Sequence, residues 1–212
     1  MSKPRVNSRT QRQRVVEAIQ KRILDGDLKP GDPLRQIPLS KEHGASQGVI
    51  RESLQTLEQY GLVTGVDKLG FVVRKLGRQE LIDAYRVREV LEGLAARLCC
   101  RKASRDDVQW LKNMAHQIHA QAGKGSRVDR SDLEYQFHQR FLLISGNEML
   151  QRVSIGYRFV GNLVVTDREP DQLLEEHLAV VEAVANNQPD EAERLARLHV
   201  ARSADSIIRH EA

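Results

Sequence analysis

The sequence has no long apolar run. Its apolar stretches are short and interrupted by charged residues, far below the roughly 20 residues that a membrane-spanning helix needs. The first residues, MSKPRVNSRTQRQR, also lack the apolar segment of a secretory signal peptide. These two absences predict a soluble protein located in the cytoplasm, without a membrane partner.

Cysteine is scarce, and the familiar catalytic motifs are missing. Cys99 and Cys100 are the only cysteines in 212 residues, and adjacent cysteines offer neither a disulfide framework nor a CxxC metal site. Because both fall in an apolar pattern with helical spacing, we interpret them as small buried residues. The chain also contains no HExxH, nucleophile elbow, P-loop or GxGxxG. No motif of this kind supports an enzyme.

The charge is distributed unevenly around a formal net charge of +4. Residues 1–76 carry 14 Lys and Arg against 8 Asp and Glu, whereas residues 77–212 carry 19 against 21. A basic surface attracts a nucleic-acid backbone, and a chain of this length fits two small domains. We therefore expect two domains, 1–76 and 77–212, of which the first binds DNA.

The pattern of the first domain predicts a winged helix-turn-helix. A helical apolar repeat over about 10–25 is followed by turn chemistry in 26–34 and a short helix near 38–43. The tight turn Gly44-Ala45-Ser46 precedes another helix, which Ser46 can cap. The second helix of such a pair offers its first residues to the major groove. Residues 62–64 and 71–74 then flank 67–70, which predicts a small hairpin or wing.

Three spaced motifs in this domain resemble one family. The runs GDLKPGDPL, LSKEHGAS-x-x-VIRESLQTLEQYGLV and GFVVRKL resemble the DNA-binding domain of GntR regulators across about residues 11–76. The resemblance implies that the partner is double-stranded operator DNA, that Arg51 contacts it from the recognition helix, and that Gly70 lies at the wing tip near the backbone. The full set of implied DNA-binding residues is Arg35, Ser46, Gln47, Gly48, Arg51 and Gly70.

One position departs from the family pattern. Where the family usually has Ser-Arg, a small residue and Pro, this chain has Ser46-Gln47-Gly48-Val49. Arginine pairs bidentately with guanine, whereas glutamine pairs with adenine. We therefore expect an altered operator sequence rather than a loss of binding. The alternative is that these are ordinary exposed helix residues.

The second domain is predicted to be helical almost throughout. Ser104 and Asp107 approximate a capping box, and Pro189 suits the first position of a helix. The expected fold class is therefore mainly α: an N-terminal winged helix-turn-helix and a C-terminal all-helical bundle. The expected helices are 81–100, 104–122, 133–145, 148 to about 166, 172–187 and 189–209.

Three of the seven histidines can meet by helix geometry. His177 lies 11 residues before the turn near Gln188 and His199 lies 11 residues after it, so both are roughly 16 Å from that turn. An antiparallel hairpin would place the two rings at one height. Glu134 and His138 share a face of another helix. Three imidazoles and a carboxylate suit zinc best, with nickel, manganese or iron as alternatives; packing in the core is the competing interpretation.

The second domain also resembles a known domain. The runs YRVREVLEGLAARLCC, E-x-x-x-FHQRFLLISGN and EEHLAVVEAVANNQPDEAERLARLH resemble the FCD effector domain of FadR-type GntR regulators. In metal-binding members, an acidic residue four positions before the first histidine joins three histidines around a divalent ion. The resemblance thus selects Glu134, His138, His177 and His199, a set that disfavours a fatty-acyl effector.

Two assignments in this domain leave alternatives open. Glu134 stands where the subfamily usually has aspartate, and Ser131-x-x-Glu134 also fits a capping box. The resemblance also implies that Arg88 pairs with the carboxylate of a small effector. Arg86 is the nearest competitor for that role, and a surface salt bridge would explain either arginine.

These expectations combine into one functional hypothesis. A homodimer binds a near-palindromic operator, and a small carboxylate effector at the metal site shifts the relative orientation of its DNA-binding domains. Repression is the expected outcome. The competing hypotheses are a metal-dependent enzyme and a regulator in which the metal is structural or is itself the signal.

Overall fold

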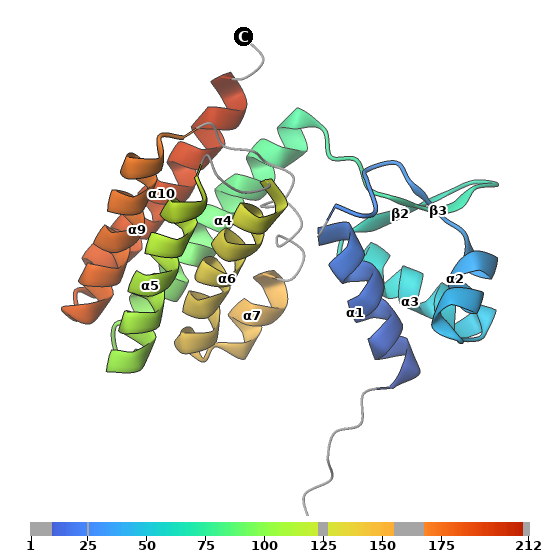
Figure 1. Ribbon diagram of the computed structural model, residues 1–212, viewed down its shortest axis with the longest axis horizontal. Helices are drawn as coiled ribbons and strands as arrows, with labels where there is room; N and C mark the ends of the chain where they lie inside the picture. Colours follow the sequence, from blue (N-terminus) through green and yellow to red (C-terminus); the bar gives the residue numbers. More distant parts are fainter. Residues whose placement is uncertain (1–9, 25, 123–126, 155–167, 210–212) are drawn as a thin grey trace, which may run out of the picture. The chain divides into compact units, whose positions relative to one another are not determined.

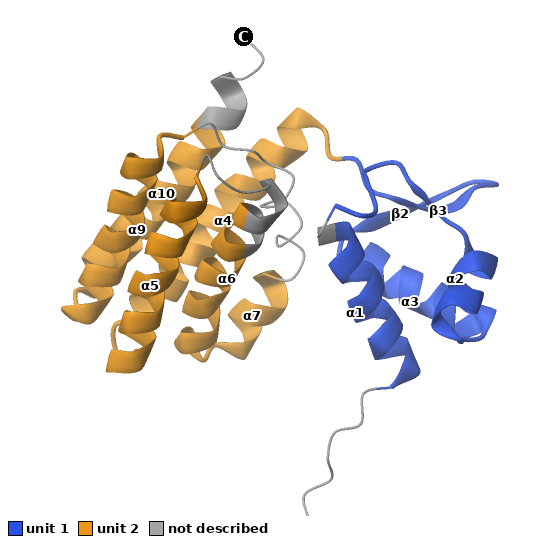
Figure 2. Cartoon of the chain, viewed as in Figure 1, with its two compact units in different colours: residues 1–75 blue, residues 76–212 orange. Residues whose placement is uncertain are grey.

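The computed structural model describes residues 10–24, 26–122, 127–154 and 168–209 (Figure 1). The chain divides into two compact units, Met1–Lys75 and Leu76–Ala212 (Figure 2). Among the described residues, no helix combines the length and the apolar character needed to cross a membrane.

The first unit is a small helical domain with a three-stranded sheet. Its core is formed by apolar side chains from both helices and strands, with Ile19, Ile50 and Val73 fully buried. In chain order the elements are α1 (Gln11–Leu24), β1 (Pro33–Leu34), α2 (Gln36–His43), α3 (Gln47–Gln59), β2 (Val63–Val66) and β3 (Gly70–Val73).

The turn between α2 and α3 has the chemistry that the sequence predicts. Gly44 ends α2 with a φ of +57°, in the left-handed region that glycine adopts without a steric penalty. The hydroxyl of Ser46 accepts a hydrogen bond from the backbone N–H of Val49 at 3.3 Å and so caps α3. This confirms the expected pair of helices; that α3 is the recognition helix stays a prediction.

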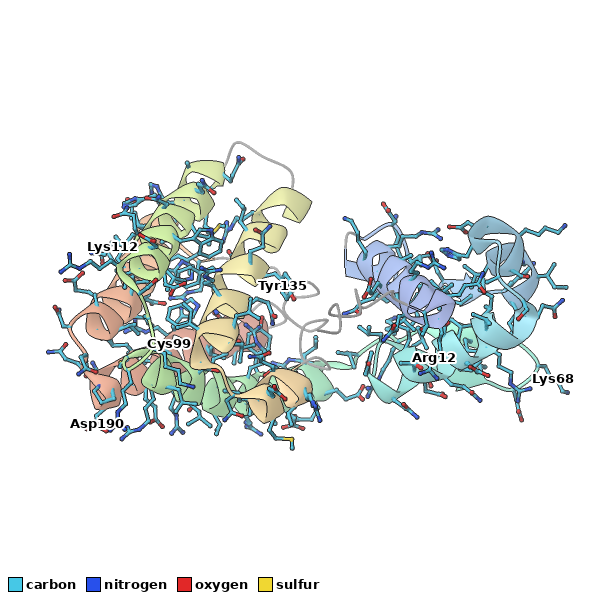
Figure 3. The ribbon with its side chains drawn as sticks, turned by 90° about the horizontal axis from the view of Figure 1, so that it is seen from below. Arg12, Lys68, Cys99, Lys112, Tyr135 and Asp190 are labelled. Atoms are coloured by element: carbon cyan, nitrogen blue, oxygen red, sulfur yellow. The ribbon has the colours of Figure 1, made fainter. Side chains whose placement is uncertain are left out.

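The wing is also confirmed, but the prediction for residues 26–34, earlier in the chain, needs one correction. Strands β2 and β3 form an antiparallel hairpin, and Lys68 lies at its tip (Figure 3). The prediction that 26–34 contains only turns is wrong at its end. Pro33 and Leu34 form β1, because Leu34 pairs with Phe71 of β3 and buries its side chain in the core. The sheet order is therefore β1-β3-β2.

In the second unit, the described residues form helices around a main apolar core, with a smaller buried cluster at Tyr85 and Val200. Helix α4 packs most extensively against α10, and Gly93 allows this close approach: a Cβ atom there would lie 2.5 Å from Cγ of Arg197. Its described elements are α4 (Arg78–Cys99), α5 (Arg105–Gln121), α6 (Arg127–Ser145), α7 (Glu148–Ser154), α9 (Pro170–Ala185) and α10 (Pro189–Arg209).

Several local predictions for this unit hold, and two need correction. Ser104 and Asp107 form the expected capping box of α5, and Cys99 (Figure 3) and Cys100 are buried. Burial raises the pKa of the Cys99 thiol to about 12, so it stays protonated. Helix α6, predicted from 133, begins at Arg127 instead.

The second correction follows from that earlier helix start. A capping box needs its first residue at the helix boundary, whereas position 131 lies inside α6. The capping interpretation of Ser131 and Glu134 is therefore wrong. The helix predicted over 148–166 is seen as α7 up to Ser154, and the remainder lies outside the described residues.

Candidate functional site

Three helices of the second unit bring three histidines together. His138 lies on α6, His177 on α9 and His199 on α10. The ring centroids of His177 and His199 are 4.7 Å apart, and His138 lies 5.2 Å from His199 and 5.9 Å from His177. One nitrogen from each ring falls within 4.8 Å of the others. The expected meeting of these histidines is confirmed.

His177 is the most deeply placed member of this histidine cluster. Its side chain is 1% exposed, and neither ring nitrogen has a hydrogen-bond partner among the described residues. Burial, with the nearby His199 and His138, holds the pKa of His177 well below 6.5. Burying a neutral imidazole without a hydrogen-bond partner costs folding free energy. His177 therefore offers a ring nitrogen that is available to bind a ligand such as a metal ion.

The other two histidines each have a carboxylate partner. Nδ1 of His138 lies 2.8 Å from Oε2 of Glu92 on α4, and Nδ1 of His199 lies 3.0 Å from Oε2 of Glu176 on α9. Metal-binding histidines commonly donate their second ring N–H to such a carboxylate. Burial also lowers the pKa of His199, against the opposing effect of Glu176.

A small cavity opens beside the three rings. Its volume is about 20 Å³, which is room for roughly one water-sized group. Apart from the histidines and Glu92, its walls are apolar. The lining residues are Glu92, Ala96, Phe137, His138, Phe141, His177, Val180, Ala196 and His199. Three imidazoles, one of them unpartnered, around a space of this size fit a divalent metal ion.

The predicted fourth ligand lies outside this group. Glu134 accepts a hydrogen bond from Nε of Arg130 at 3.0 Å. Its carboxylate does not belong to the group of candidate ligand atoms, one from each histidine, that lie within 4.8 Å of one another. Both side chains are about one-quarter exposed. Ligation by Glu134 would therefore require its carboxylate to leave Arg130.

Arg88, the predicted effector contact, is buried and already paired. Its guanidinium lies 2.8 Å from Oε1 of Glu92 and 4.7 Å from the ring centroid of Tyr85. The competing Arg86 is exposed and pairs with Asp83 at 3.0 Å. Of these two arginines, Arg88 is the one connected to the histidine cluster, through Glu92.

Sequence reasoning missed the charged residues that surround the histidines. Glu92 bridges Arg88 and His138, while Glu176 accepts hydrogen bonds from Arg168, Arg202 and His199. The spacing of Arg88 and Glu92 at i and i+4 could have indicated their pairing. No sequence pattern pointed to Glu176 or Arg168, because they pair with each other eight residues apart and with side chains of α10.

The candidate DNA contacts lie on the surface of the first unit. Gln47, Gly48 and Arg51 occupy the first turns of α3 and are exposed. The other predicted residues, Arg35, Ser46 and Gly70, are also exposed. The structure thus leaves all six free of burial in the core, and their contacts with DNA stay a prediction.

A winged helix-turn-helix followed by a helical domain with a buried polar site is the architecture of a DNA-binding transcriptional regulator. Comparison with protein families supports this class at the level of sequence. Residues 11–73 match the model for bacterial regulatory proteins of the gntR family, and residues 83–202 match the FCD domain. The chain belongs to the GntR family of bacterial transcriptional regulators, with the FadR-type combination of domains.

Individual relatives agree with this assignment. The chain is 26% identical to YdhC, an uncharacterized HTH-type transcriptional regulator of Bacillus subtilis, over 85% of this chain and 84% of that protein. It is 27% identical to the Nta operon transcriptional regulator of Aminobacter aminovorans, over 85% and 87%. Several other relatives are named repressors, and two, from different strains of Escherichia coli, are named activators.

A solved structure shows the same fold. E. coli McbR/YncC superimposes with a TM-score of 0.79 and 17% sequence identity, covering 96% of this chain and all of that chain. The family and its relatives are transcriptional regulators rather than enzymes, so the hypothesis of a metal-dependent enzyme is wrong.

Proposed function

We propose that this protein is an operator-binding repressor whose DNA affinity is set by a small carboxylate effector at a metal-containing pocket of the helical unit. The observation that carries the proposal is His177. Neither of its ring nitrogens has a hydrogen-bond partner among the described residues, and it lines a cavity of about 20 Å³ together with His138 and His199.

The three histidines would hold the metal ion, with Glu134 as a fourth ligand. Zinc is the first candidate, because imidazole nitrogens and one carboxylate oxygen are ordinary zinc ligands; nickel, manganese and iron accept the same donors. Once bound, the ion would supply a concentrated positive charge that can coordinate a carboxylate.

The charges around the histidine cluster favour an anionic effector. Four arginines outnumber three glutamates there: Arg88, Arg130, Arg168 and Arg202 against Glu92, Glu134 and Glu176. Arg88 is the proposed partner of the effector carboxylate. Because Arg88 is paired with Glu92 and the cavity is small, the effector would enter by displacing that pairing. Such an exchange moves side chains of α4.

The DNA-binding form would be a homodimer on a near-palindromic operator. Helix α4 supports this, because Val87, Val90 and Leu94 form an apolar stripe on its solvent side, with exposed fractions of 38%, 53% and 37%. Burial of such a stripe against a second copy would remove apolar surface from water. Since the target is operator DNA, the protein would act in the cytoplasm.

The first experiment combines elemental analysis of the purified protein with calorimetric titration of small carboxylates, before and after chelation. We expect one divalent metal ion per chain. We also expect a carboxylate whose binding disappears with the metal and in His177→Ala. The matched control is His116→Ala, which removes an exposed histidine of α5 outside the cluster.

Operator binding is then measured with and without the effector so identified. A change in operator affinity at saturating effector supports the sensor. An unchanged affinity contradicts it. Loss of the fold on chelation would instead mean a structural metal, and loss of DNA binding on chelation alone would make the metal itself the signal. If the protein binds no metal, the three histidines are core residues and the proposed pocket is wrong.

A further inference from the structure

Two largely buried glutamates contact two of the three clustered histidines, and each contact is made with Nδ1 of the ring. Glu92 reaches Nδ1 of His138 from α4, and Glu176 reaches Nδ1 of His199 from α9, at 2.8 and 3.0 Å. The glutamate side chains are only 14% and 11% exposed. Each histidine is therefore oriented by a carboxylate that belongs to a different helix.

The arginines around these glutamates fix the direction of both hydrogen bonds. Glu92 pairs with Arg88 at 2.8 Å, and Glu176 pairs with Arg202 at 2.6 Å and also with Arg168. A carboxylate in such pairs is ionised and can only accept hydrogen bonds. The proton of each hydrogen bond therefore belongs to Nδ1 of the histidine.

A second contact to the same histidine is consistent with this direction. Nη1 of Arg168 lies 3.5 Å from Nδ1 of His199, but both atoms then carry hydrogens, so neither can accept from the other. The shorter contact with Glu176 is the hydrogen bond. A neutral imidazole with its proton on Nδ1 has its lone pair on Nε2.

We propose that Glu92 and Glu176 are positioning residues that lock His138 and His199 as Nδ1–H tautomers, so that Nε2 of each ring binds the metal ion. The proposal rests on the metal-containing pocket proposed above. His177, which has no such carboxylate, is left to the ion alone for a partner.

A different function for these glutamates would be to join helices by ordinary ion pairs. The chain provides a control for that function. Glu89 pairs with Arg197 at 3.0 Å and links α4 to α10, with a side chain 26% exposed, and no histidine is among its described contacts. Glu89→Gln therefore removes a comparable ion pair without touching the histidine cluster.

The direct test is nitrogen NMR of the wild-type protein labelled with 15N-histidine, with and without zinc. We expect His138 and His199 to be Nδ1–H tautomers without metal and to keep the Nδ1 proton when zinc binds. Zinc binding through Nδ1 of either ring would overturn the proposal. The measurement needs no variant, so it stands even if a buried substitution prevents folding.

The second test is the zinc affinity of Glu176→Gln, Glu92→Gln and Glu89→Gln, measured by competition with a chelator. Loss of such a carboxylate partner typically weakens metal affinity 10–100-fold; we expect roughly that loss for the first two variants and none for the third. Wild-type affinity in both Glu176→Gln and Glu92→Gln would overturn this inference alone. A wild-type protein that binds no zinc would overturn the proposed pocket, and this inference with it.

Discussion

Two buried histidines make the stability of the second unit depend on pH. Burial lowers the pKa of His177 and His199 below 6.5, so the unfolded chain takes up protons at a higher pH than the folded one. Burial alone would raise the pKa of Glu176, but hydrogen bonds from His199, Arg168 and Arg202 outweigh it and lower that pKa to about 2. Glu176 thus loses its stabilising effect only at lower pH.

We expect the metal-free protein to lose stability as the pH falls below about 6.5. The unfolded state then binds more protons than the folded state, and each histidine contributes a slope of up to about 1.4 kcal/mol per pH unit until its folded pKa is reached. Urea unfolding between pH 7.5 and 5 measures this slope. His177→Met should reduce it, and His116→Ala should not. An unreduced slope in His177→Met would mean that His177 is already protonated in the folded protein.

Glu134 offers a second test at single-residue scale. To bind the metal ion, Glu134 must give up the hydrogen bond from Arg130. The loss of that hydrogen bond offsets part of the free energy gained by metal binding. We therefore expect Glu134→Gln to weaken zinc binding, but less than His177→Ala does. Competition with a chelator measures both affinities, and Gln136→Ala on the same helix is the control. Unchanged affinity in Glu134→Gln would leave a ligand set of three histidines.

At the level of the helices, the hairpin of α9 and α10 places the rings of His177 and His199 at the same distance along the two helix axes from the turn. The turn is formed by residues 186–188, where Asn187 has a φ of +51°, and His177 and His199 each lie 11 residues from Gln188, its last residue. Their ring centroids are 4.7 Å apart, as the equal spacing predicts. Helix α6 then completes the cluster with His138.

Helix α3 carries the prediction about operator sequence. The exposed Gln47 stands at its first position, from which an amide can pair with adenine and a guanidinium with guanine. We expect Gln47→Arg to change the preferred base at one operator position from adenine to guanine, with a discrimination of about 1–3 kcal/mol. Selection of binding sites from random DNA measures this preference.

The control for this change is Gln59→Arg, at the last position of the same helix. It adds the same charge far from the helix N-terminus, so it should raise affinity for DNA in general without altering the selected sequence. If Gln47→Arg selects the same sites as the wild type, Gln47 does not read a base.

At the scale of the whole molecule, charge and apolar surface are divided between the two units. The excess of basic residues lies in 1–76, whereas the exposed apolar stripe of α4 lies in the second unit. This division supports the proposal that DNA contact and self-association belong to separate units. A dimer through the second unit would set the spacing of two recognition helices.

We expect Val90→Glu to convert the proposed dimer to a monomer and to weaken operator binding at low protein concentration. Val90 is 53% exposed, so a charge there should leave the monomer folded while placing a carboxylate in an apolar interface. Sedimentation velocity measures the association, and Gln117→Glu on the exposed side of α5 is the charge-matched control. A Val90→Glu protein that remains dimeric would place the interface elsewhere.

Local structure and family membership could both be predicted from the sequence alone. Local features depend on interactions between residues that are close in the chain, so their sequence patterns can be recognised before the tertiary structure is known. Examples are the turn Gly44-Ala45-Ser46, the capping box of Ser104 and the hairpin around Asn187. The spaced motifs of the two domains likewise identified a GntR regulator with an FCD domain. The short strand β1 was not predicted from the sequence, because its two residues form a strand only by pairing with β3.

Only the tertiary structure decided how the charged side chains around the histidines are paired. Glu92 holds His138, and Glu176 holds His199, while Glu134 lies with Arg130 and Arg88 lies with Glu92. Two of these four pairs join different helices, and a buried charge takes whichever partner the packing brings within hydrogen-bond reach. Sequence spacing could place His177 and His199 at one level, but it could not show that His177 has no hydrogen-bond partner among the described residues.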